Sequence, residues 1–374
     1  MAKLSFNNHP DPFFKALKVK VDAYFSANNI ERSGNRKLHL KGLILTVSLI
    51  ALYVELVFFT PVWYIAIPLC GLMGLNLASI GFNIMHEGVH ASFSKWKWLN
   101  TVSAHSLNVM GGNQHFWKLK HVVNHHTYTN IQHMDYDIET KLLRVHENQE
   151  HLWFHKYQHL YWFLLYGLSY MAWIFYEDFL KYFSGRVNPL AEKKVLANNE
   201  QIIFWVSKAL YVILYLVVPI MVLGFAKTMA GFFIMGITCG YIIAVVFQLA
   251  HIVEGTHFPQ PSKEHNRIEQ EWAIHQVETT ADFATKSVVI NWLLGGLNFQ
   301  VEHHLFPKIS HVHYSQINKM VKETCLEFGV VYLEYPTVAK ALRSHVMHIY
   351  KLGQIGLDGL PVLAVPVLSQ PVLA

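Results

Sequence analysis

Charged residues are scarce in this chain, and their scarcity argues against a soluble fold. Asp, Glu, Lys and Arg make up 15% of the 374 residues, against about 25% in a typical soluble domain. No run of Lys or Arg of the kind that binds nucleic acid occurs. The three cysteines, Cys70, Cys239 and Cys325, are too far apart in sequence to suggest a disulfide framework or a CxxC metal site. The polar first 41 residues contain no short apolar stretch before a small-residue cleavage site, so we expect no cleaved signal peptide.

The hydrophobic residues of the chain are concentrated in long apolar runs. Hydrophobic residues make up 52% of the chain, and about 20 apolar residues cross a bilayer as a helix. The first two runs are joined at Pro61 and the last two near Lys227, which predicts two hairpins. In the second run, small residues such as Gly74 recur at helical spacing, a pattern that lets helices pack closely. The predicted spans are residues 42–60, 62–85, 209–226 and 228–250.

A fifth apolar segment, residues 160–176, is rich in Tyr and Trp, which favour the membrane interface. The histidine clusters described below can share one metal site only if an even number of crossings separates them. Spans 209–226 and 228–250 already supply two crossings, so segment 160–176 is predicted to lie along the surface or to re-enter. The basic segment 1–41 places the histidine face in the cytoplasm by the positive-inside rule.

Histidine is unusually abundant, with 24 residues, and three clusters lie at or beyond the ends of the spans. Residues four apart share a helix face, and an adjacent residue points about 100° away and could reach a second metal. The clusters are His86-Glu87-Gly88-Val89-His90, His121-Val122-Val123-Asn124-His125-His126 and Gln300-Val301-Glu302-His303-His304. The predicted same-face pairs are His86 with His90, His121 with His125, and Gln300 with His304.

The number of histidines favours a site larger than one tetrahedral zinc. Imidazole binds iron, copper, zinc and nickel, so ligand type does not select the metal. Structural zinc takes four ligands, whereas the three clusters offer seven histidines. A single HxxxH pair at the end of a span is commonly structural, but three clusters outside the spans favour a shared metal site. His251, at the end of the fourth span, is a further candidate, with interfacial snorkelling as the alternative.

At these residues the sequence resembles the membrane-bound fatty-acid desaturases, from the first span to about residue 315. The resemblance rests on HEGVH (86–90), on HVVNHHTYTN (121–130) followed by Met134-Asp135-Tyr136-Asp137, and on GGLNFQVEHHLFP (295–307). Gln300, in place of the first histidine of the third box, is similar to front-end desaturases, which insert a double bond between an existing one and the carboxyl end. The sequence also resembles bacterial acyl-CoA desaturases. Glu87 stands where relatives often have aspartate, and Phe247 where some acyl-CoA desaturases have asparagine.

The resemblance implies a set of metal ligands and a cofactor of two non-haem iron ions. Side chains beside the boxes could orient the imidazoles through their free N–H groups, with helix capping or solvated charge as the alternative. The implied ligands are His86, His90, His121, His125, His126, His251, His303 and His304, with Gln300 as a ligand or neighbouring group. The candidate orienting residues are Glu87, Asn124, Asp135, Asp137 and Glu302.

The resemblance also implies the reaction, the insertion of a double bond into a fatty acyl chain at the expense of dioxygen and two electrons. The sequence leaves open whether the acyl carrier is coenzyme A, a carrier protein or a lipid. The sequence has no His-Pro-Gly-Gly haem signature, which implies a separate electron donor, a ferredoxin or a cytochrome b-type carrier with its reductase. A membrane di-iron hydroxylase or monooxygenase of lipids is the alternative, since it would use nearly the same ligands. A metal transporter is disfavoured because the spans are nearly free of polar groups.

We therefore expect an all-α integral membrane protein with four transmembrane helices in two hairpins and a cytoplasmic helical cap that holds a di-iron site. Residues 1–41 would form a cytoplasmic amino-terminal segment, residues 42–315 the membrane desaturase domain, and residues 316–374 a cytoplasmic segment. The proline-containing stretch from residue 360 is predicted to be a flexible tail.

Overall fold

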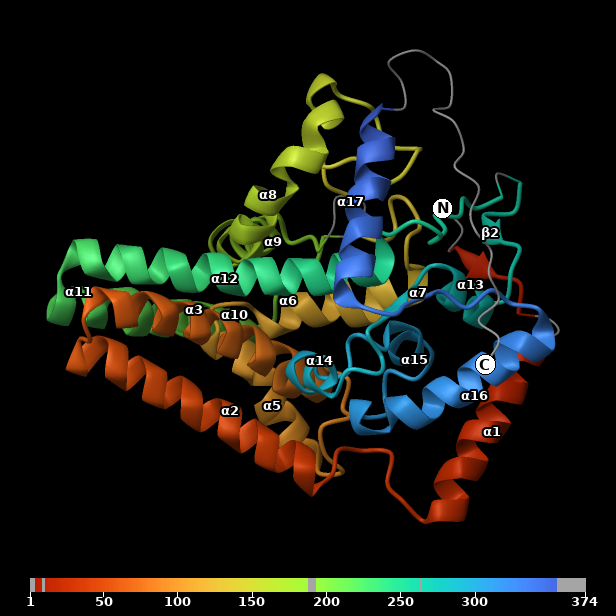
Figure 1. The fold of residues 1–374 in the computed structure, drawn as a ribbon, viewed down its shortest axis with the longest axis horizontal. Coiled ribbons are helices and arrows are strands. Elements are labelled where there is room, and N and C mark those ends of the chain that lie inside the picture. Colours follow the sequence, from red (N-terminus) through yellow and green to blue (C-terminus); the bar gives the residue numbers. More distant parts are fainter. Residues whose placement is uncertain (1–3, 9–10, 188–192, 263, 355–374) are drawn as a thin grey trace.

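The computed structural model describes residues 4–8, 11–187, 193–262 and 264–354, so the predicted carboxyl-terminal tail lies outside the described residues. These residues are mostly helical, which confirms the coarse all-α prediction. The long helices extend together towards one end of the molecule, and helices α13, α15 and α16 gather at the other (Figure 1). The α-helices are α1 Pro12–Asn28, α2 Arg36–Val54, α3 Trp63–Ile80, α4 His86–Val89, α5 Lys97–Val109, α6 Gln114–Lys118, α7 His126–Tyr128, α8 Gln158–Ala172, α9 Asp178–Ser184, α10 Asn198–Val212, α11 Val218–Leu223, α12 Phe225–His251, α13 Trp272–Glu278, α14 Val288–Leu294, α15 Gln300–Leu305, α16 Tyr314–Phe328 and α17 Val338–Gln354.

Short π-helical and 3₁₀ turns interrupt or extend these helices. The π-helical turns are η1 Glu55–Phe59, η2 Gly81–Met85, η3 Leu119–His125, η5 Trp173–Glu177 and η6 Ile213–Val217. The 3₁₀ turns are η4 Trp153–Tyr157 and η7 His311–His313.

Four continuous helices in the described residues are long and apolar enough to cross a membrane, as predicted, but their ends differ from the hydropathy boundaries. The first begins at Arg36 because the Asn35 side chain caps it, accepting hydrogen bonds from the amides of Lys37 and Leu38. Gly224, with φ +82°, separates the third helix from the fourth. The four helices are Arg36–Phe59, Trp63–Val89, Asn198–Leu223 and Phe225–His251.

Helix α12 lies at the centre of the long helices and packs against both α3 and α8. The contact with α3 is close at Gly74, where a Cβ atom would overlap the carbonyl oxygen of Met235. The contact with α8 includes a hydrogen bond of 3.1 Å from the Ser169 hydroxyl to the Gly240 carbonyl. Helix α8, which carries most of segment 160–176, is not among the four described helices that satisfy the length and hydropathy of a span. Its position along the surface stays a prediction.

The helices at the other end share a separate apolar core. Phe13, Leu17 and Val21 of α1 pack with residues of α15 and α16, such as Val301 and Ile317. Two short parallel strand pairs, which the sequence did not predict, join distant segments: β1 (Ser5–Phe6) with β2 (Arg267–Ile268), and β3 (Asp282–Phe283) with β4 (Glu334–Tyr335). Because α1 and α16 pack together, parts of the predicted amino- and carboxyl-terminal segments contribute to one core. The domain division at residues 41 and 315 stays a prediction.

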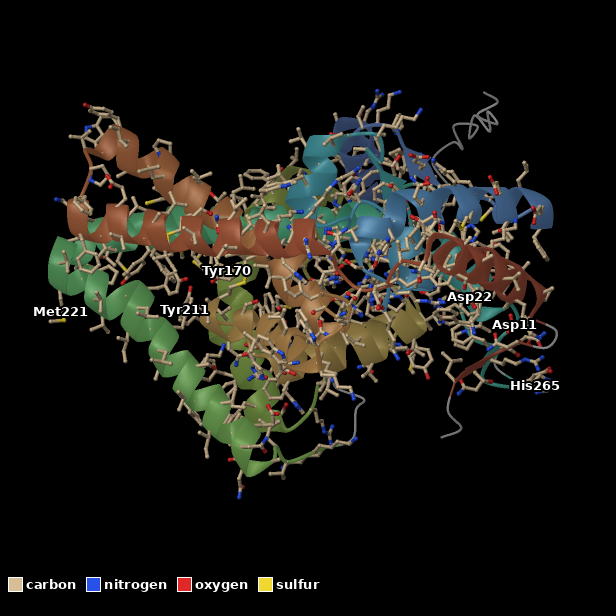
Figure 2. All side chains as sticks on the ribbon, turned by 90° about the horizontal axis from the view of Figure 1, so that it is seen from below. Asp11, Asp22, Tyr170, Tyr211, Met221 and His265 are labelled. Atoms are coloured by element: carbon tan, nitrogen blue, oxygen red, sulfur yellow. The ribbon has the colours of Figure 1, made fainter. Side chains whose placement is uncertain are left out.

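The two ends of the molecule differ in polarity. Met221, in α11, lies at the end to which the long helices extend, whereas Asp11, Asp22 and His265 lie at the opposite end (Figure 2). Exposed side chains along α2 include Leu43, Val47 and Ile50, which suits contact with lipid. The fold therefore has exposed apolar side chains along the long helices and polar residues at the opposite end.

Candidate metal centre

Two π-helical turns lead directly into the first two histidine clusters. Turn η2 (Gly81–Met85) runs into α4, which begins at His86, and turn η3 (Leu119–His125) runs into α7, which begins at His126. A π-turn forms i→i+5 hydrogen bonds, and such turns are frequent at functional sites. His86 to His90 therefore belong to the last turn of the second long helix and its end, rather than to a loop beyond the span.

The structure brings eight of the predicted site residues into two buried groups. In the first group, nitrogen atoms of four histidines all lie within 4.8 Å of one another, and in the second the same holds for three histidines. Gln300 joins the second group, because its Nε2 lies 3.1 Å from Nε2 of His251 and 3.5 Å from Nε2 of His304. The first group is His86, His90, His121 and His303, and the second is His125, His251 and His304.

The ninth residue, His126, lies between the two groups. Its Nε2 is 3.2 Å from Nε2 of His121, and its ring centroid is 4.5 Å from that of His303 and 4.4 Å from that of His304. The rings of His121 and His125 stack 5.3 Å apart, as residues on one face should. Each belongs to a different histidine group, but the two also form a further possible metal-holding group with Asp137. The π-turn also brings His121 and His126, five residues apart, together, which α-helical spacing did not predict.

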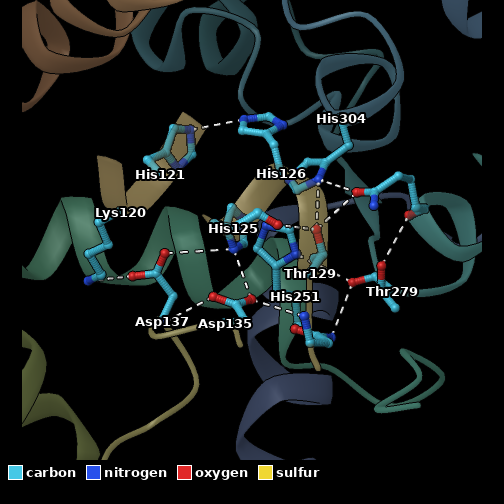
Figure 3. A network of polar contacts seen from close by, with 12 residues as sticks. Lys120, His121, His125, His126, Thr129, Asp135, Asp137, His251, Thr279 and His304 are labelled. Carbon is cyan, nitrogen blue, oxygen red and sulfur yellow. Dashed lines mark hydrogen bonds and ion pairs between the residues drawn. The ribbon is translucent and has the colours of Figure 1, made fainter. Parts of the chain in front are cut away.

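Partners outside the groups hold several imidazole rings by their Nδ1 atoms (Figure 3). His125 donates to the Asp135 carboxylate over 2.9 Å, and His304 donates to the Gln276 side-chain oxygen over 2.8 Å. His251 donates to the Thr279 carbonyl over 3.3 Å. His303 Nδ1 lies 3.2 Å from the Tyr314 hydroxyl. Each contact fixes the ring and leaves Nε2 directed into the group, the arrangement in which histidine binds a metal.

Several inward atoms of both groups have no hydrogen-bond partner although they are buried. They are Nε2 of His90, His125 and His303, and Oε1 of Gln300. Buried polar atoms are rarely left unsatisfied in folded proteins, so their concentration here fits residues that are arranged to hold metal ions. The two groups together supply more nitrogen ligands than one tetrahedral zinc requires.

Burial keeps most of these imidazoles neutral, the form that binds metal. It lowers the pKa of His90 to about 3 and holds the pKa of His121, His126, His303 and His304 well below the usual value. His125 is the exception. Burial disfavours its charged form, but the Asp135 and Asp137 carboxylates outweigh that effect and raise its pKa.

The other candidate orienting residues have different partners. Asp137 forms an ion pair with Lys120 over 2.5 Å, and its other oxygen lies 3.7 Å from His125. Glu87 accepts hydrogen bonds from the amide and the ring of His311, which belongs to neither group. Glu302 accepts from Asn318 and Tyr332. The half-buried Asn124 side chain has no hydrogen-bond partner among the described residues.

Three residues that orient histidine rings were not predicted from the sequence: Gln276, Thr279 and Tyr314. No motif marks them, and Thr279 acts through a backbone carbonyl that any residue would supply. Two aromatic residues also touch the first group. Trp117 stacks on His121 with ring centroids 4.4 Å apart, and Phe247, which replaces the asparagine of some acyl-CoA desaturases, meets the same ring edge-on at 5.7 Å.

The sequence model described as "Fatty acid desaturase" matches residues 59–336 of this chain. The chain belongs to the fatty acid desaturase family. This desaturase is 36% identical to the acyl-lipid (8-3)-desaturase of Physcomitrium patens, over 93% of its own length and 74% of that relative. It is also 36% identical to the sn-1 linoleoyl-lipid 6-desaturase of Arthrospira platensis, over 91% of its length and 92% of the relative. The corresponding enzyme of Synechocystis is 31% identical over 91% of this chain and 96% of the relative.

These comparisons confirm the prediction of a fatty-acid desaturase, an oxidoreductase that acts on fatty acyl chains. They favour desaturation over the hydroxylase alternative. The buried histidine groups give this desaturase a site that could hold metal.

Proposed function

We propose that the chain is a front-end acyl-lipid desaturase with two iron ions held by the two histidine groups. The observation that carries the proposal is the pairing of these buried groups, with unsatisfied inward atoms, in a chain of the desaturase family. His86, His90, His121 and His303 would hold one ion. His125, His251, His304 and Gln300 would hold the other, with His126 adjacent to both.

The bound irons would supply the one-electron chemistry that no side chain offers, by which dioxygen removes two hydrogen atoms from neighbouring CH₂ groups. Overall, the acyl CH₂–CH₂ pair, dioxygen, two electrons and two protons become CH=CH and two water molecules. The protein's own part is to hold the ligands and exclude bulk water. Asp135, Gln276 and Thr279 fix three rings by Nδ1, and the imidazoles of both groups are buried.

Gln300 and the relatives support the proposed front-end type and lipid carrier. Gln300 lies within hydrogen-bond distance of His251 and contributes to the second group. The relatives named above are described as acyl-lipid and linoleoyl-lipid desaturases. We propose the same substrate class here, with a separate carrier that delivers the electrons.

The fatty-acid profile of a host that expresses the chain tests this function. With a compatible electron donor, we expect a new double bond on the carboxyl side of an existing one in polyunsaturated chains, detected by gas chromatography of total fatty acids. An unchanged profile, despite iron-loaded protein and a working reductant, would contradict the proposal. Hydroxylated chains without new alkenes would favour the monooxygenase alternative.

The proposed membrane arrangement has four crossings in two hairpins, with the histidine cap in the cytoplasm and the desaturase domain over residues 42–315. It is supported by the four long apolar helices and by Met221 lying at the end remote from the cap. In this arrangement, segment 160–176 does not cross.

Single-cysteine labelling should report this topology. Lys141→Cys and Lys194→Cys, on exposed residues either side of α8 and α9, are expected to react with a membrane-impermeant reagent from the same, cytoplasmic side. Lys227→Cys, at an exposed residue in the first turn of the fourth helix, should react only from the opposite side. The native cysteines are buried and should give little background. Labelling of positions 141 and 194 from opposite sides would mean that α8 and α9 cross, contrary to the proposed topology.

A further inference from the structure

Three exposed tryptophans belong to segments that adjoin the histidine clusters. Trp96 and Trp98 follow the first cluster in the stretch Lys95-Trp96-Lys97-Trp98, where all four side chains are exposed. Trp292 lies in the short helix α14 and is exposed as well. Single exposed apolar residues are normal on a folded protein, but a group of them marks an interaction surface.

Contacts with α2 place these tryptophans near the beginning of the first long helix. The His39 ring in α2 donates to the Phe93 carbonyl over 3.1 Å, three residues before Trp96. The Lys41 ammonium group, also in α2, lies 4.9 Å from the centre of the Trp292 ring. Figure 1 likewise shows α5 and α14 near the end at which the chain enters α2. Both exposed segments therefore lie beside the first turns of α2.

Helix α5 extends this surface with an apolar stripe. Trp98 is 64% exposed and Val102 60%, and Val109 is exposed on the same face, because these positions are four and seven residues apart. The opposite face of α5 is buried. On α14, Val288 and Val289 are exposed. A helix with one exposed apolar face and with Trp and Lys at its end is typical of helices that lie in a membrane interface.

Exposed cations surround the tryptophans. The Lys95 ammonium group lies 5.7 Å from the centre of the Trp96 ring. Four further cations are exposed in the first turn of α2, at the start of α5 and just before α14, and none of the five has an ion-pair partner among the described residues. Unpaired cations beside interfacial tryptophans suit the anionic lipids of a cytoplasmic leaflet. The five are Lys95, Lys97, Arg36, Lys37 and Lys286.

We propose that residues 95–98, the exposed face of α5 and α14 together bind the anionic phospholipid head groups of the cytoplasmic leaflet. The inference rests on the proposed membrane arrangement, in which the first turn of α2 lies at the cytoplasmic membrane surface. The surface continues the lipid-facing side of α2, where Leu40 and Leu43 are exposed. An acidic protein would also be attracted to the cations, but the exposed valines beside a lipid-facing helix favour a bilayer.

The surface is joined closely to the first histidine cluster. Gly88 packs on α5 so tightly that a Cβ atom would lie 2.4 Å from the Ala104 amide nitrogen. The Asn100 side chain donates to the Ser94 carbonyl over 2.7 Å and accepts from the Ser94 amide over 2.8 Å. Lipid bound at residues 95–98 therefore contacts the same unit that supports the first histidine cluster.

Fluorescence quenching measures how deeply this surface enters a bilayer. Val102→Cys on α5 and Leu326→Cys on an exposed residue of α16 are each labelled with bimane, and the buried native cysteines should react little. In vesicles of phosphatidylcholine and phosphatidylglycerol, chain-brominated lipid should remove most of the fluorescence at position 102 and little at position 326. Iodide on both sides of the membrane should give the reverse result.

Removing two cations tests the preference for anionic lipid. Native mass spectrometry of the full-length protein in detergent gives its affinity for phosphatidylglycerol relative to phosphatidylcholine. Lys95→Gln combined with Lys97→Gln should lower this relative affinity about 25-fold, because each lysine near an anionic surface contributes about fivefold. Lys15→Gln combined with Lys18→Gln removes the same charge from exposed positions of α1 and should leave it unchanged.

Three results would overturn the proposal. The first is iodide quenching at position 102 as strong as at position 326. The second is a phosphatidylglycerol affinity that is unchanged in the Lys95 and Lys97 variant, or that falls equally in both double variants. The third is protection of position 102 only after an acidic electron carrier is added, which would assign the surface to that protein. Neither measurement depends on which leaflet the surface meets, so the sidedness labels at positions 141 and 194 test the topology separately.

Discussion

His303→Ala or His126→Ala should abolish the new double bond while the protein still accumulates in membranes. Each ring lies among the histidines of the two groups, and His303 leaves a buried Nε2 atom without a partner, so its role is metal binding rather than packing. We expect the wild type to carry about two irons per chain and little zinc, and either variant to lose iron. Product should fall by more than about 100-fold, beyond the 10–100-fold typical of changes to groups that orient metal ligands. Gas chromatography and metal analysis of the same preparation measure both effects.

Two matched changes show whether the loss is specific. Glu55→Gln alters an exposed carboxylate of the first long helix, and His133→Asn removes an exposed histidine with a residue that tolerates its backbone φ of +65°, so both should retain activity and iron. Asp135→Asn should give an intermediate loss, because it weakens the hydrogen bond that orients His125 without removing a ligand. A single tightly held zinc per wild-type chain, or full activity in His303→Ala, would contradict the di-iron proposal.

The clustering of the histidines was predictable because its signal is local. HxxxH spacing, doublets of histidine and their position at span ends can be read without tertiary structure, and all nine nominated residues lie together in the fold. The division into two groups could not be read in the same way. It depends on the π-turn before His126 and on how α4, α7, α12 and α15 meet, and these are set by tertiary packing.

Other features depend on contacts between distant residues. Gln276 and Tyr314 orient histidines from α13 and α16, and neither residue has a spacing that links it to the boxes. Glu87 is next to His86 in the sequence, but its carboxylate accepts a hydrogen bond from His311, which belongs to neither group. The sequence does not indicate which imidazole this carboxylate contacts. The ends of the long helices differ from the predicted span boundaries because hydropathy marks where lipid contact stops. Backbone hydrogen bonding continues each helix beyond that point through polar residues.

Lys208 is a residue outside a predicted span that lies within a helix in the structure. The hydropathy boundary at residue 209 left it just outside the third span, yet it lies within α10 and is buried. Its ammonium group donates to the carbonyls of Gly111 and Ile174 and to the Asp178 carboxylate, over 2.6, 2.8 and 2.8 Å. Ile174 belongs to the π-turn η5. One side chain thus ties the third long helix to the turn after α5 and to the junction of α8 and α9.

Among the single substitutions proposed outside the metal centre, Lys208→Met should lower the stability of the fold the most. Burial raises the pKa of Asp178 in spite of the neighbouring lysine, so desolvation outweighs the attraction and the pair itself adds little net stability. Removing one partner is different, because it leaves a buried carboxylate uncompensated and costs about 3–5 kcal/mol. The thermal midpoint in detergent should fall, whereas Lys227→Met, at an exposed lysine, should leave it unchanged. Lys208→Met combined with Asp178→Leu should recover part of the loss by removing the orphaned charge. A double variant less stable than Lys208→Met would show instead that Asp178 stabilises the fold through contacts other than the ion pair.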